Sequence, residues 1–514
     1  MNGAEALLRT ASGAGVDVCF ANPGTTEMQL VAALDAVPGM RAVLGLFEGV
    51  CTGAADGYAR MLRKPALTVL HLGPGFANGI ANLHNARRAR VPIVNLIGDH
   101  ASWHLPYDAP LSSDIESLAR PVSGWLRSSA SAKELARDGA DAIRAALTPP
   151  GQIATLIVPQ DCAWDVAEGP ARVAPAPAPA AVSEVVVADV ATALASREPA
   201  VLFLGGEALG ERALRAAERI AAASGCRVLT ETFYTRQERG GDLPAFTRLP
   251  YFPEQAREAL APCRHLVVAG TREPIGFFGY PDGRSRLAPD DARRLVLASP
   301  GDDVAGALEA LAERLGAPAR ASVAPLPARP ARPSGPLDPA RLGQAIAALQ
   351  PEGAIVVDEA ATSGLAYAAL SAGARRHTAL ALTGGAIGQG LPCATGAAVA
   401  CPDRKVIAFQ ADGSGMYTAQ ALWTMARESL DVTVVICSNR AYRILQAELS
   451  RAGIAEPGVN ARTLTDLSHP DLDWVALARG LGVPGRRADS AEAFCEAFER
   501  ALVERGPALI EAVL

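Results

Sequence analysis

Short apolar segments rich in Val, Leu and Ile alternate along this chain with Ala-rich stretches of helical composition. Strands that are apolar throughout are typical of parallel sheets covered on both faces. Parallel neighbours need a crossover connection, which the Ala-rich stretches supply as helices. We therefore predict an α/β fold of doubly wound parallel sheets. The strands expected on this basis span residues 66–72, 91–99, 200–206, 265–270, 293–299, 353–360, 405–412 and 431–439.

Two Pro- and Ala-rich stretches, residues 166–184 and 316–336, interrupt this alternation. Their composition leaves little apolar surface to bury and suits semi-rigid linkers. At 514 residues the chain is also too long for a single core. We predict three domains, each built on a doubly wound parallel sheet, at residues 1–165, 185–315 and 337–514.

The composition excludes several classes of function. A net charge of −6 without a basic block argues against nucleic acid or an anionic membrane as a partner. No apolar run approaches 18 residues, so we expect no membrane span. The nine cysteines are scattered without a CxxC pair, as is typical of reduced thiols in the cytosol. The first residues, MNGAEALLRTASG, lack a cationic start before an apolar stretch, so we expect no signal peptide and a cytoplasmic location.

The stretch from 410 to 442 carries the clearest chemistry. Asp412 ends one apolar segment and Asn439 ends the next, 27 positions later. In a parallel sheet both would lie at the carboxyl edge, where such folds place their ligands. Carboxylate and amide oxygens suit Mg²⁺, with diphosphate oxygens completing its shell, and the N–H groups of Gly413 and Ser414 can face phosphate. The segment indicates a metal-anchored diphosphate site; the alternative is an ordinary βαβ unit with Asp and Asn in its turns.

This segment resembles the thiamine diphosphate (ThDP) motif of the ThDP-dependent 2-oxo acid decarboxylase and acetolactate synthase superfamily, in which GDG is followed after a spacer by NN. Ala411 replaces the first Gly and Ser438 the first Asn, but both metal-ligand positions are retained. The resemblance implies that Ala441 supplies a third metal ligand through its carbonyl and that Tyr442 contacts the cofactor. It extends over essentially the whole chain, with pyrimidine-binding, middle and diphosphate-binding domains in that order.

Glu48 is the candidate for activating the cofactor. It stands between an apolar run and a predicted helix, in the sequence GLFEGVCTGAADGYAR. A buried carboxyl can hydrogen-bond a ring nitrogen of the cofactor and exchange a proton with it. The spacing from Glu48 to ADGYAR (55–60) resembles the context of the family's activating Glu. The alternative is a surface Glu favoured by the helix dipole.

The resemblance places further residues around the cofactor. In the Gly-rich stretch 383–398, Gly385 corresponds to a carbonyl that accepts from the 4′-amino group, and Ile387 to the apolar wedge that bends ThDP. Thr362 is a candidate diphosphate contact, with a helix cap as the alternative. Thr25 and His71 follow strands of the first domain at the positions of a substrate-binding Ser and a catalytic His of benzoylformate decarboxylase. His71 would handle a proton.

The function implied is ThDP- and Mg²⁺-dependent decarboxylation of a 2-oxo acid, followed by carboligation of the remaining fragment to a second carbonyl, as in acetolactate synthase. The alternative is a benzoylformate decarboxylase-type enzyme that releases an aldehyde. Pro110 and Leu111 replace the Phe-Gln of acetolactate synthases, and Glu448 stands at their Trp position. The second active-site His of benzoylformate decarboxylase corresponds to the vicinity of Phe278. FAD, which acetolactate synthases bind, has no specific motif in residues 185–315.

The resemblance also implies a homodimer or homotetramer whose active sites lie at the subunit interface. Two other classes of protein remain as rivals. A dinucleotide-binding oxidoreductase is disfavoured because no G-x-G-x-x-G follows a strand with an acidic residue about 20 positions on. A non-catalytic ThDP-binding subunit is disfavoured by the presence of Glu48.

Overall fold

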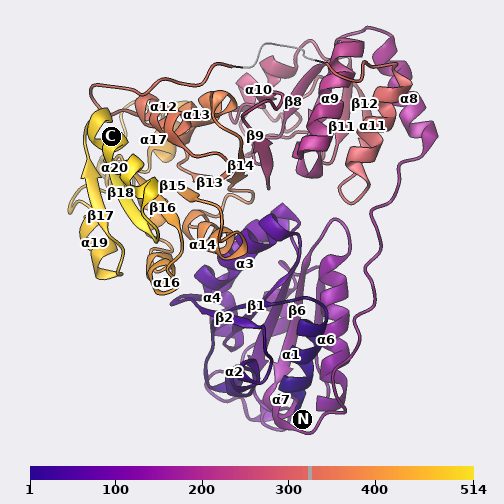
Figure 1. The fold of residues 1–514 in the computed structure, drawn as a ribbon, viewed down its shortest axis with the longest axis vertical. Helices are drawn as coiled ribbons and strands as arrows, with labels where there is room; N and C mark the ends of the chain where they lie inside the picture. Colours follow the sequence, from indigo (N-terminus) through magenta and orange to yellow (C-terminus); the bar gives the residue numbers. More distant parts are fainter. Residues whose placement is uncertain (322–326) are drawn as a thin grey trace. The chain divides into compact units, whose positions relative to one another are not determined.

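The computed structural model describes residues 1–321 and 327–514. The chain folds into two compact units (Figure 1). Unit 1 comprises residues 1–176, 330–370 and 381–514, and unit 2 comprises residues 177–329 and 371–380. The predicted domain boundaries stay a prediction, and residues 322–326 of the second predicted linker lie outside the described residues.

The N-terminal part of unit 1 is a six-stranded parallel sheet of order β2-β1-β3-β4-β6-β5, here called the N-terminal sheet. Its strands are β1 (Val18–Asn22), β2 (Arg41–Leu44), β3 (Ala66–Leu70), β4 (Ile93–Asp99), β5 (Trp125–Ser128) and β6 (Ile153–Pro159). Its helices are α1 (Gly3–Gly13), η1 (Thr25–Glu27), α2 (Met28–Asp35), α3 (Glu48–Leu62), α4 (Leu72–Ala89), η2 (Leu105–Tyr107), α5 (Ile115–Ala119), α6 (Ala132–Leu147) and α7 (Gln160–Trp164). Every residue of β3, β4 and β6 is buried, which is why these strands are mostly apolar. Their buried polar residues Thr68, Asn95 and Thr155 bond to one another across the sheet.

The C-terminal part of unit 1 is built on another parallel sheet, the C-terminal sheet, with the strand order β17-β18-β16-β15-β13. Its strands are β13 (Ala354–Glu359), β15 (Val406–Ala411), β16 (Val432–Ser438), β17 (Gly485–Ala488) and β18 (Ala508–Val513). Its helices are α12 (Pro339–Leu349), α13 (Gly364–Leu370), α14 (Gly390–Ala400), α15 (Asp412–Gly415), α16 (Ala421–Arg427), α17 (Arg443–Arg451), α18 (Val459–Thr463), α19 (Trp474–Gly480) and α20 (Ala491–Val503).

Unit 2 is built on a parallel sheet of its own, of order β10-β8-β7-β11-β12. Its strands are β7 (Ala200–Leu204), β8 (Arg227–Thr230), β10 (Thr247–Arg248), β11 (His265–Ala269) and β12 (Arg293–Ala298), and β9 (Gln237–Arg239) pairs antiparallel with β14 (His377–Ala381). Its helices are α8 (Glu184–Ala195), η3 (Gly206–Leu209), α9 (Glu211–Ser224), α10 (Pro253–Leu260), α11 (Val304–Arg314) and η4 (Ser371–Gly373). The predicted α/β class with three doubly wound, mostly parallel sheets is confirmed, and all eight predicted strands are present within one to two residues of their expected ends.

Helix α3 of the N-terminal sheet packs directly against α14 of the C-terminal sheet within unit 1 (Figure 1). Glycines allow the close approach, because a Cβ on Gly57 would lie 2.0 Å from the carbonyl oxygen of Cys393, and a Cβ on Gly396 would lie 1.8 Å from that of Ala54. Alongside this contact, the fully buried Arg60 makes paired hydrogen bonds of 2.7 and 2.8 Å to Asp56. The ADGYAR segment therefore joins the two parts of unit 1.

The arginine also reaches the segment before α14. Arg60 donates to the carbonyl of Ala381 at 2.7 Å and to Oγ1 of Thr383 at 3.0 Å. Gln389 donates its amide to Asp56 Oδ2 at 2.5 Å. These bonds satisfy a charged pair that would otherwise be costly to bury.

Candidate active site

The two predicted metal ligands lie side by side. Strands β15 and β16 are parallel neighbours in which Ala411 pairs with Cys437, so Asp412 and Asn439 both leave the sheet at its carboxyl edge. Asp412 is 2% exposed; its Oδ1 accepts the N–H of Gly413 at 2.8 Å. Asn439 Oδ1 accepts the N–H of Ala441 at 3.0 Å. This is the arrangement expected from the sequence.

The donor set fits a hard divalent cation. Burial raises the pKa of Asp412, and N–H groups of Arg440 and Gly413 oppose that rise. A bound cation would offset the buried negative charge in the same sense. Among the described residues no cluster of three or more His, Cys, Asp or Glu side chains could hold a metal. The ligands of a metal at this site would be oxygen atoms of three kinds: a carboxylate, a side-chain amide and a backbone carbonyl.

Other residues of this edge are packed closely. A Cβ on Gly413 would lie 2.5 Å from Cε1 of Tyr442, so only glycine fits beside that ring. The hydroxyl of Ser414 accepts from Gln410 Nε2 at 2.5 Å and donates to the carbonyl of Ala411 at 3.3 Å. Gly413 and Ser414 are both buried at the start of α15. Because the N–H of Gly413 already donates to Asp412 Oδ1, the N–H of Ser414 is the candidate phosphate donor at this edge.

Three of the eight non-glycine residues that have a left-handed φ in the described part of the chain lie directly beside predicted site residues. Left-handed φ values occur at Leu72 (44°), next to His71, at Ala361 (48°), next to Thr362, and at Arg440 (56°), next to Asn439. Such conformations are costly for residues other than glycine and concentrate at functional sites. At Arg440 the left-handed backbone accompanies a hydrogen bond, in which the N–H of Arg440 donates to Asp412 Oδ2 at 2.7 Å.

The loop that contains Gly385 and Ile387 is held at its C-terminal end by Glu359. Gly385 has a φ of 79° and is exposed, and Ile387 is partly buried. Glu359, at the end of β13, accepts the N–H of Gly388 at 2.6 Å and also that of Gly390. Burial raises the pKa of Glu359 to about 7, although these N–H groups oppose the rise.

Glu48 is the first residue of α3 and is 9% exposed. Its Oε2 accepts from Asn78 Nδ2 at 3.0 Å. A Cβ on Gly75 would lie 3.0 Å from Glu48 Oε1, so the first turn of α4 passes directly over the carboxyl group. The predicted burial of Glu48 is therefore present, and it belongs to the N-terminal part of unit 1, whereas Asp412 belongs to the C-terminal part.

Helix α4 connects these parts through asparagines on one face. Asn78, Asn82 and Asn85 follow each other at spacings of four and three residues. Asn78 bonds to Glu48, and Asn82 donates to the carbonyl of Gly49 at 2.8 Å. Asn85 donates to the carbonyl of Ala386 at 2.7 Å and accepts its N–H at 3.2 Å.

His71 directly precedes α4 and has an acidic partner that the sequence did not reveal. Its Nδ1 lies 2.8 Å from Oε2 of the fully buried Glu27 and 3.1 Å from Oγ1 of Thr26. Thr25, the predicted substrate contact, is exposed. The only available signal was the segment NPGTTE itself, because Glu27 and His71 are 44 residues apart. Thr362 lies partly buried in the turn before α13.

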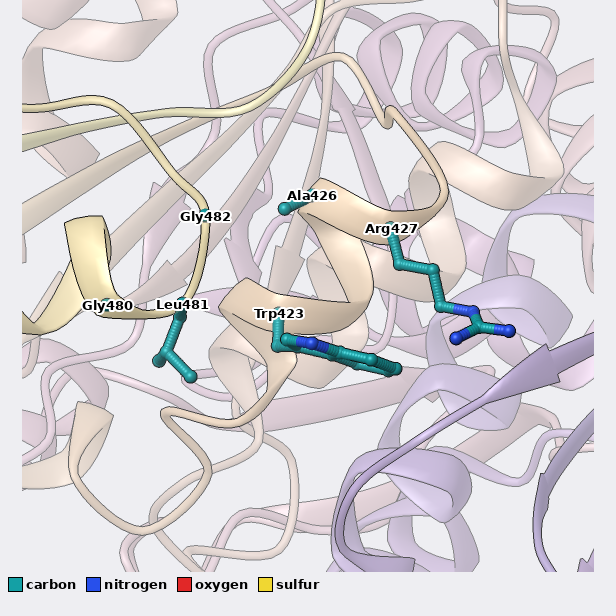
Figure 2. Close-up of a pocket in the computed structure, with 6 residues that line it drawn as sticks. All are labelled: Trp423, Ala426, Arg427, Gly480, Leu481 and Gly482. Carbon is teal, nitrogen blue, oxygen red and sulfur yellow. The ribbon is translucent and has the colours of Figure 1, made fainter.

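A cavity of about 420 Å³ lies elsewhere in the C-terminal part of unit 1. It is formed by α16 and by the turn that follows α19, and its lining residues are Trp423, Ala426, Arg427, Gly480, Leu481 and Gly482 (Figure 2). The guanidinium of Arg427 lies 5.2 Å from the ring centre of Trp423. None of the predicted site residues lines this cavity.

Comparison with known proteins agrees with the geometry of the site. The N-terminal TPP binding domain of thiamine pyrophosphate enzymes matches residues 1–118, and the C-terminal TPP binding domain of these enzymes matches residues 362–512. The chain therefore belongs to the thiamine pyrophosphate enzymes, and ThDP is its cofactor by family. It is a ThDP-dependent enzyme related to acetolactate synthase and benzoylformate decarboxylase.

Individual relatives span the whole chain. IlvX of Mycobacterium tuberculosis, provisionally named an acetolactate synthase large subunit, is 52% identical over 100% of this chain and 99% of its own. Benzoylformate decarboxylase of Pseudomonas aeruginosa is 30% identical over 97% of this chain and 96% of its own. The structure of the ThDP-dependent 4-hydroxybenzoylformate decarboxylase of Rhodococcus jostii RHA1 superposes with a TM-score of 0.87 at 27% identity, covering 99% of this chain and 98% of that one. In the described part of the chain, no helix is both long and apolar enough to cross a bilayer.

Proposed function

We propose that this chain decarboxylates a 2-oxo acid with bound ThDP and Mg²⁺. Two observations together carry the proposal. Asp412 and Asn439 leave neighbouring strands at the carboxyl edge of one sheet, and the same chain buries Glu48 at the start of α3. A diphosphate anchor and a ring-activating acid are the two protein functions that ThDP chemistry requires.

The proposal gives each site residue a role toward Mg²⁺ or ThDP. Asp412, Asn439 and the carbonyl of Ala441 would hold Mg²⁺, and the N–H group of Ser414 would face the diphosphate. When bound, ThDP supplies a carbon nucleophile and a sink for the electrons left by departing CO₂. Glu48 exchanges a proton with the aminopyrimidine ring, and its hydrogen bond from Asn78 orients the carboxyl group for that task.

Two fates of the decarboxylated fragment remain as candidates. Ligation to a second carbonyl compound is favoured by the 52% identity to a protein named as an acetolactate synthase large subunit. Protonation and release of an aldehyde is favoured by the His71–Glu27 pair, which is built to carry a proton, and by the likeness to benzoylformate decarboxylases. A panel of pyruvate, 2-ketobutyrate, branched and aromatic 2-oxo acids, with and without FAD, separates them: acetolactate from pyruvate supports ligation, and benzaldehyde from benzoylformate supports release.

Two substitutions test the cofactor site directly. Glu48→Gln is expected to lose most turnover while keeping Mg²⁺-dependent ThDP affinity, because the anchor is untouched. Asp412→Ala is expected to lose that affinity in calorimetry. If wild-type protein binds no ThDP in the presence of Mg²⁺, or if Glu48→Gln turns over normally, the proposal fails.

The proposal includes a homodimer or homotetramer in which ThDP lies between the first domain of one subunit and the third of its partner. Mixing Glu48→Gln chains with Asp412→Ala chains then builds one intact site in every hybrid dimer. Random exchange would recover about a quarter of wild-type activity from two inactive proteins. Absence of recovery in dimers shown by mass spectrometry to be hybrid would place the whole site within one chain.

A cytoplasmic location completes the proposal. All nine cysteines lie in the described part of the chain, eight of them are buried and no disulfide joins them.

A further inference from the structure

Glu27 is a charged side chain that is buried completely, and three polar groups surround its carboxylate. Its side chain has 0% exposure. Oε2 accepts the N–H of Gly24 at 2.7 Å, and Oε1 accepts the hydroxyl of Thr26 at 2.5 Å. The third group is Nδ1 of His71, 2.8 Å from Oε2. A buried carboxylate needs this degree of hydrogen bonding to be stable.

The pattern of donors determines which nitrogen of His71 carries hydrogen. The hydroxyl hydrogen of Thr26 is directed to Glu27, so Oγ1 presents a lone pair to Nδ1 at 3.1 Å. Glu27 Oε2 is also an acceptor. Both atoms that face Nδ1 therefore accept, and Nδ1 must donate. In the neutral ring this leaves Nε2 as the basic nitrogen.

Packing fixes the ring in this position. A Cβ on Gly24 would lie 2.3 Å from Nδ1 of His71, and a Cβ on Gly75 would lie 3.2 Å from the Cβ of His71. The same Gly75 position is 3.0 Å from Oε1 of Glu48, so the side chain of His71 and the proposed activating acid both lie against the first turn of α4. The side chain of His71 keeps 22% exposure, and no group in residues 1–321 or 327–514 bonds to its Nε2.

Other titratable groups lie at the same end of the N-terminal sheet. Asp99 ends β4 and His100 follows it, and a Cβ on Gly98 would lie 1.8 Å from Glu27 Oε1, so β4 packs directly against the carboxylate. Burial raises the pKa of Asp99, and the charge of Glu27 adds to that rise. Glu27 is the carboxylate among these that contacts His71 directly.

We propose that Glu27 is a positioning residue that holds His71 in the Nδ1–H tautomer and leaves Nε2 to transfer a proton at the reacting end of the substrate. Nε2 takes a proton from solvent, the Glu27 carboxylate offsets the charge of the resulting imidazolium, and Nε2 then gives the proton to the fragment that has lost CO₂. Thr26 completes the arrangement as a hydrogen-bond acceptor for Nδ1. The inference rests on the proposed function in one respect, since the proton must have a substrate to go to.

The first test is spectroscopic and needs no substrate. Long-range ¹H–¹⁵N spectra of histidine-labelled protein, recorded at about pH 8.5 where an ordinary imidazole is neutral, report the tautomer of each ring. The signals of His71 are assigned by their loss in His71→Asn. We expect Nδ1–H in the wild type. In Glu27→Gln the Thr26 hydroxyl is released from a carboxylate and can donate to Nδ1, so we expect a mixture of tautomers. A wild-type His71 in the Nε2–H form overturns the proposal.

The second test is kinetic. Glu27→Gln is expected to lower kcat about 10²- to 10⁴-fold, with KM and ThDP affinity within a few-fold of wild type, because positioning the imidazole affects the chemical step. Glu27→Asp keeps the charge and should recover part of kcat. The matched control is Glu231→Gln in unit 2, where a carboxylate accepts from Gly206 N–H at 2.7 Å and Thr271 Oγ1 at 2.9 Å.

Equal kcat in Glu27→Gln and Glu231→Gln overturns the positioning role. If Glu27→Gln does not fold, the wild-type tautomer and the kcat of Glu27→Asp still decide the question. If the wild type turns over no 2-oxo acid, the proposed function fails, while the tautomer measurement continues to test Glu27 by itself.

Discussion

Replacement of Gly57 by alanine tests the contact between α3 and α14. Gly57 lies in the middle of α3, and the added methyl group would lie 2.0 Å from the carbonyl oxygen of Cys393 and 2.7 Å from its carbonyl carbon. Both are backbone atoms of α14, so no side-chain rotation can relieve the overlap. The two helices must move apart. Gly13, the exposed last residue of α1, has nothing within 4 Å of the corresponding position and provides the control.

The two variants should move stability in opposite directions. Alanine in a helix gains about 0.5–1 kcal/mol over glycine, which is the whole effect expected at Gly13. At Gly57, overpacking costs about 1–3 kcal/mol or more and exceeds that gain. The helix gain applies to both variants, so they should differ by the overpacking cost, about 1–3 kcal/mol in the free energy of unfolding. For 514 residues unfolding together, this corresponds to about 1–3 °C in Tm.

Thermal unfolding followed by circular dichroism measures the difference, and calorimetry with ThDP and Mg²⁺ measures its consequence. Helix α3 begins at Glu48, and α14 follows the loop with Gly385 and Ile387, so separating the helices should also weaken ThDP binding in Gly57→Ala. Gly13→Ala should bind normally. A Gly57→Ala protein that melts at or above the wild-type temperature would show that α3 and α14 do not pack as described.

Three further predictions follow from buried polar groups. Arg60→Leu leaves the Asp56 carboxylate buried without its partner and should cost about 3–5 kcal/mol in urea unfolding, with partial recovery in the double variant with Asp56→Asn. Burial raises the pKa of Glu359 to about 7 from its usual value near 4.5, so its contribution to stability is complete below pH 4.5 and is lost as the pH rises through 7. Glu359→Gln should remove this component, worth up to about 3 kcal/mol, from urea midpoints measured between pH 5 and 8; an unchanged pH dependence contradicts the assignment. Asn85→Ala loses two hydrogen bonds to Ala386 and should weaken ThDP binding about tenfold, whereas the exposed Asn460→Ala should not.

The sequence alone was sufficient to predict the strands and the residues that lie at their ends. Apolar segments such as 91–99 predicted β4, and the residues that end two such segments, Asp412 and Asn439, predicted a shared edge. The burial of Glu48 also agrees with the apolar residues that precede it, whereas its role stays a prediction. These are inferences from local order, and parallel α/β folds convert local order into position reliably.

Contacts between distant segments could not be inferred in this way. Nothing in NPGTTE distinguishes the exposed Thr25 from Thr26, whose hydroxyl faces His71, because the difference arises from a contact across 45 residues. Likewise, ADGYAR was interpreted as the context of Glu48, although its Asp56 and Arg60 form the buried pair beside α14. A charged pair in a helix is usually solvated, and only its neighbours in space show otherwise.

Helix α4 links residues of the candidate site that are far apart in the sequence. His71 precedes it, Asn78 orients Glu48, and Asn85 holds the backbone of Ala386 beside the predicted cofactor loop. A helix is rigid along its length, so the imidazole of His71, the carboxyl group of Glu48 and the loop keep fixed relative positions. In the proposed dimer, the Glu48 end of α4 would serve one cofactor, and its Asn85 end would hold the loop that contacts the other.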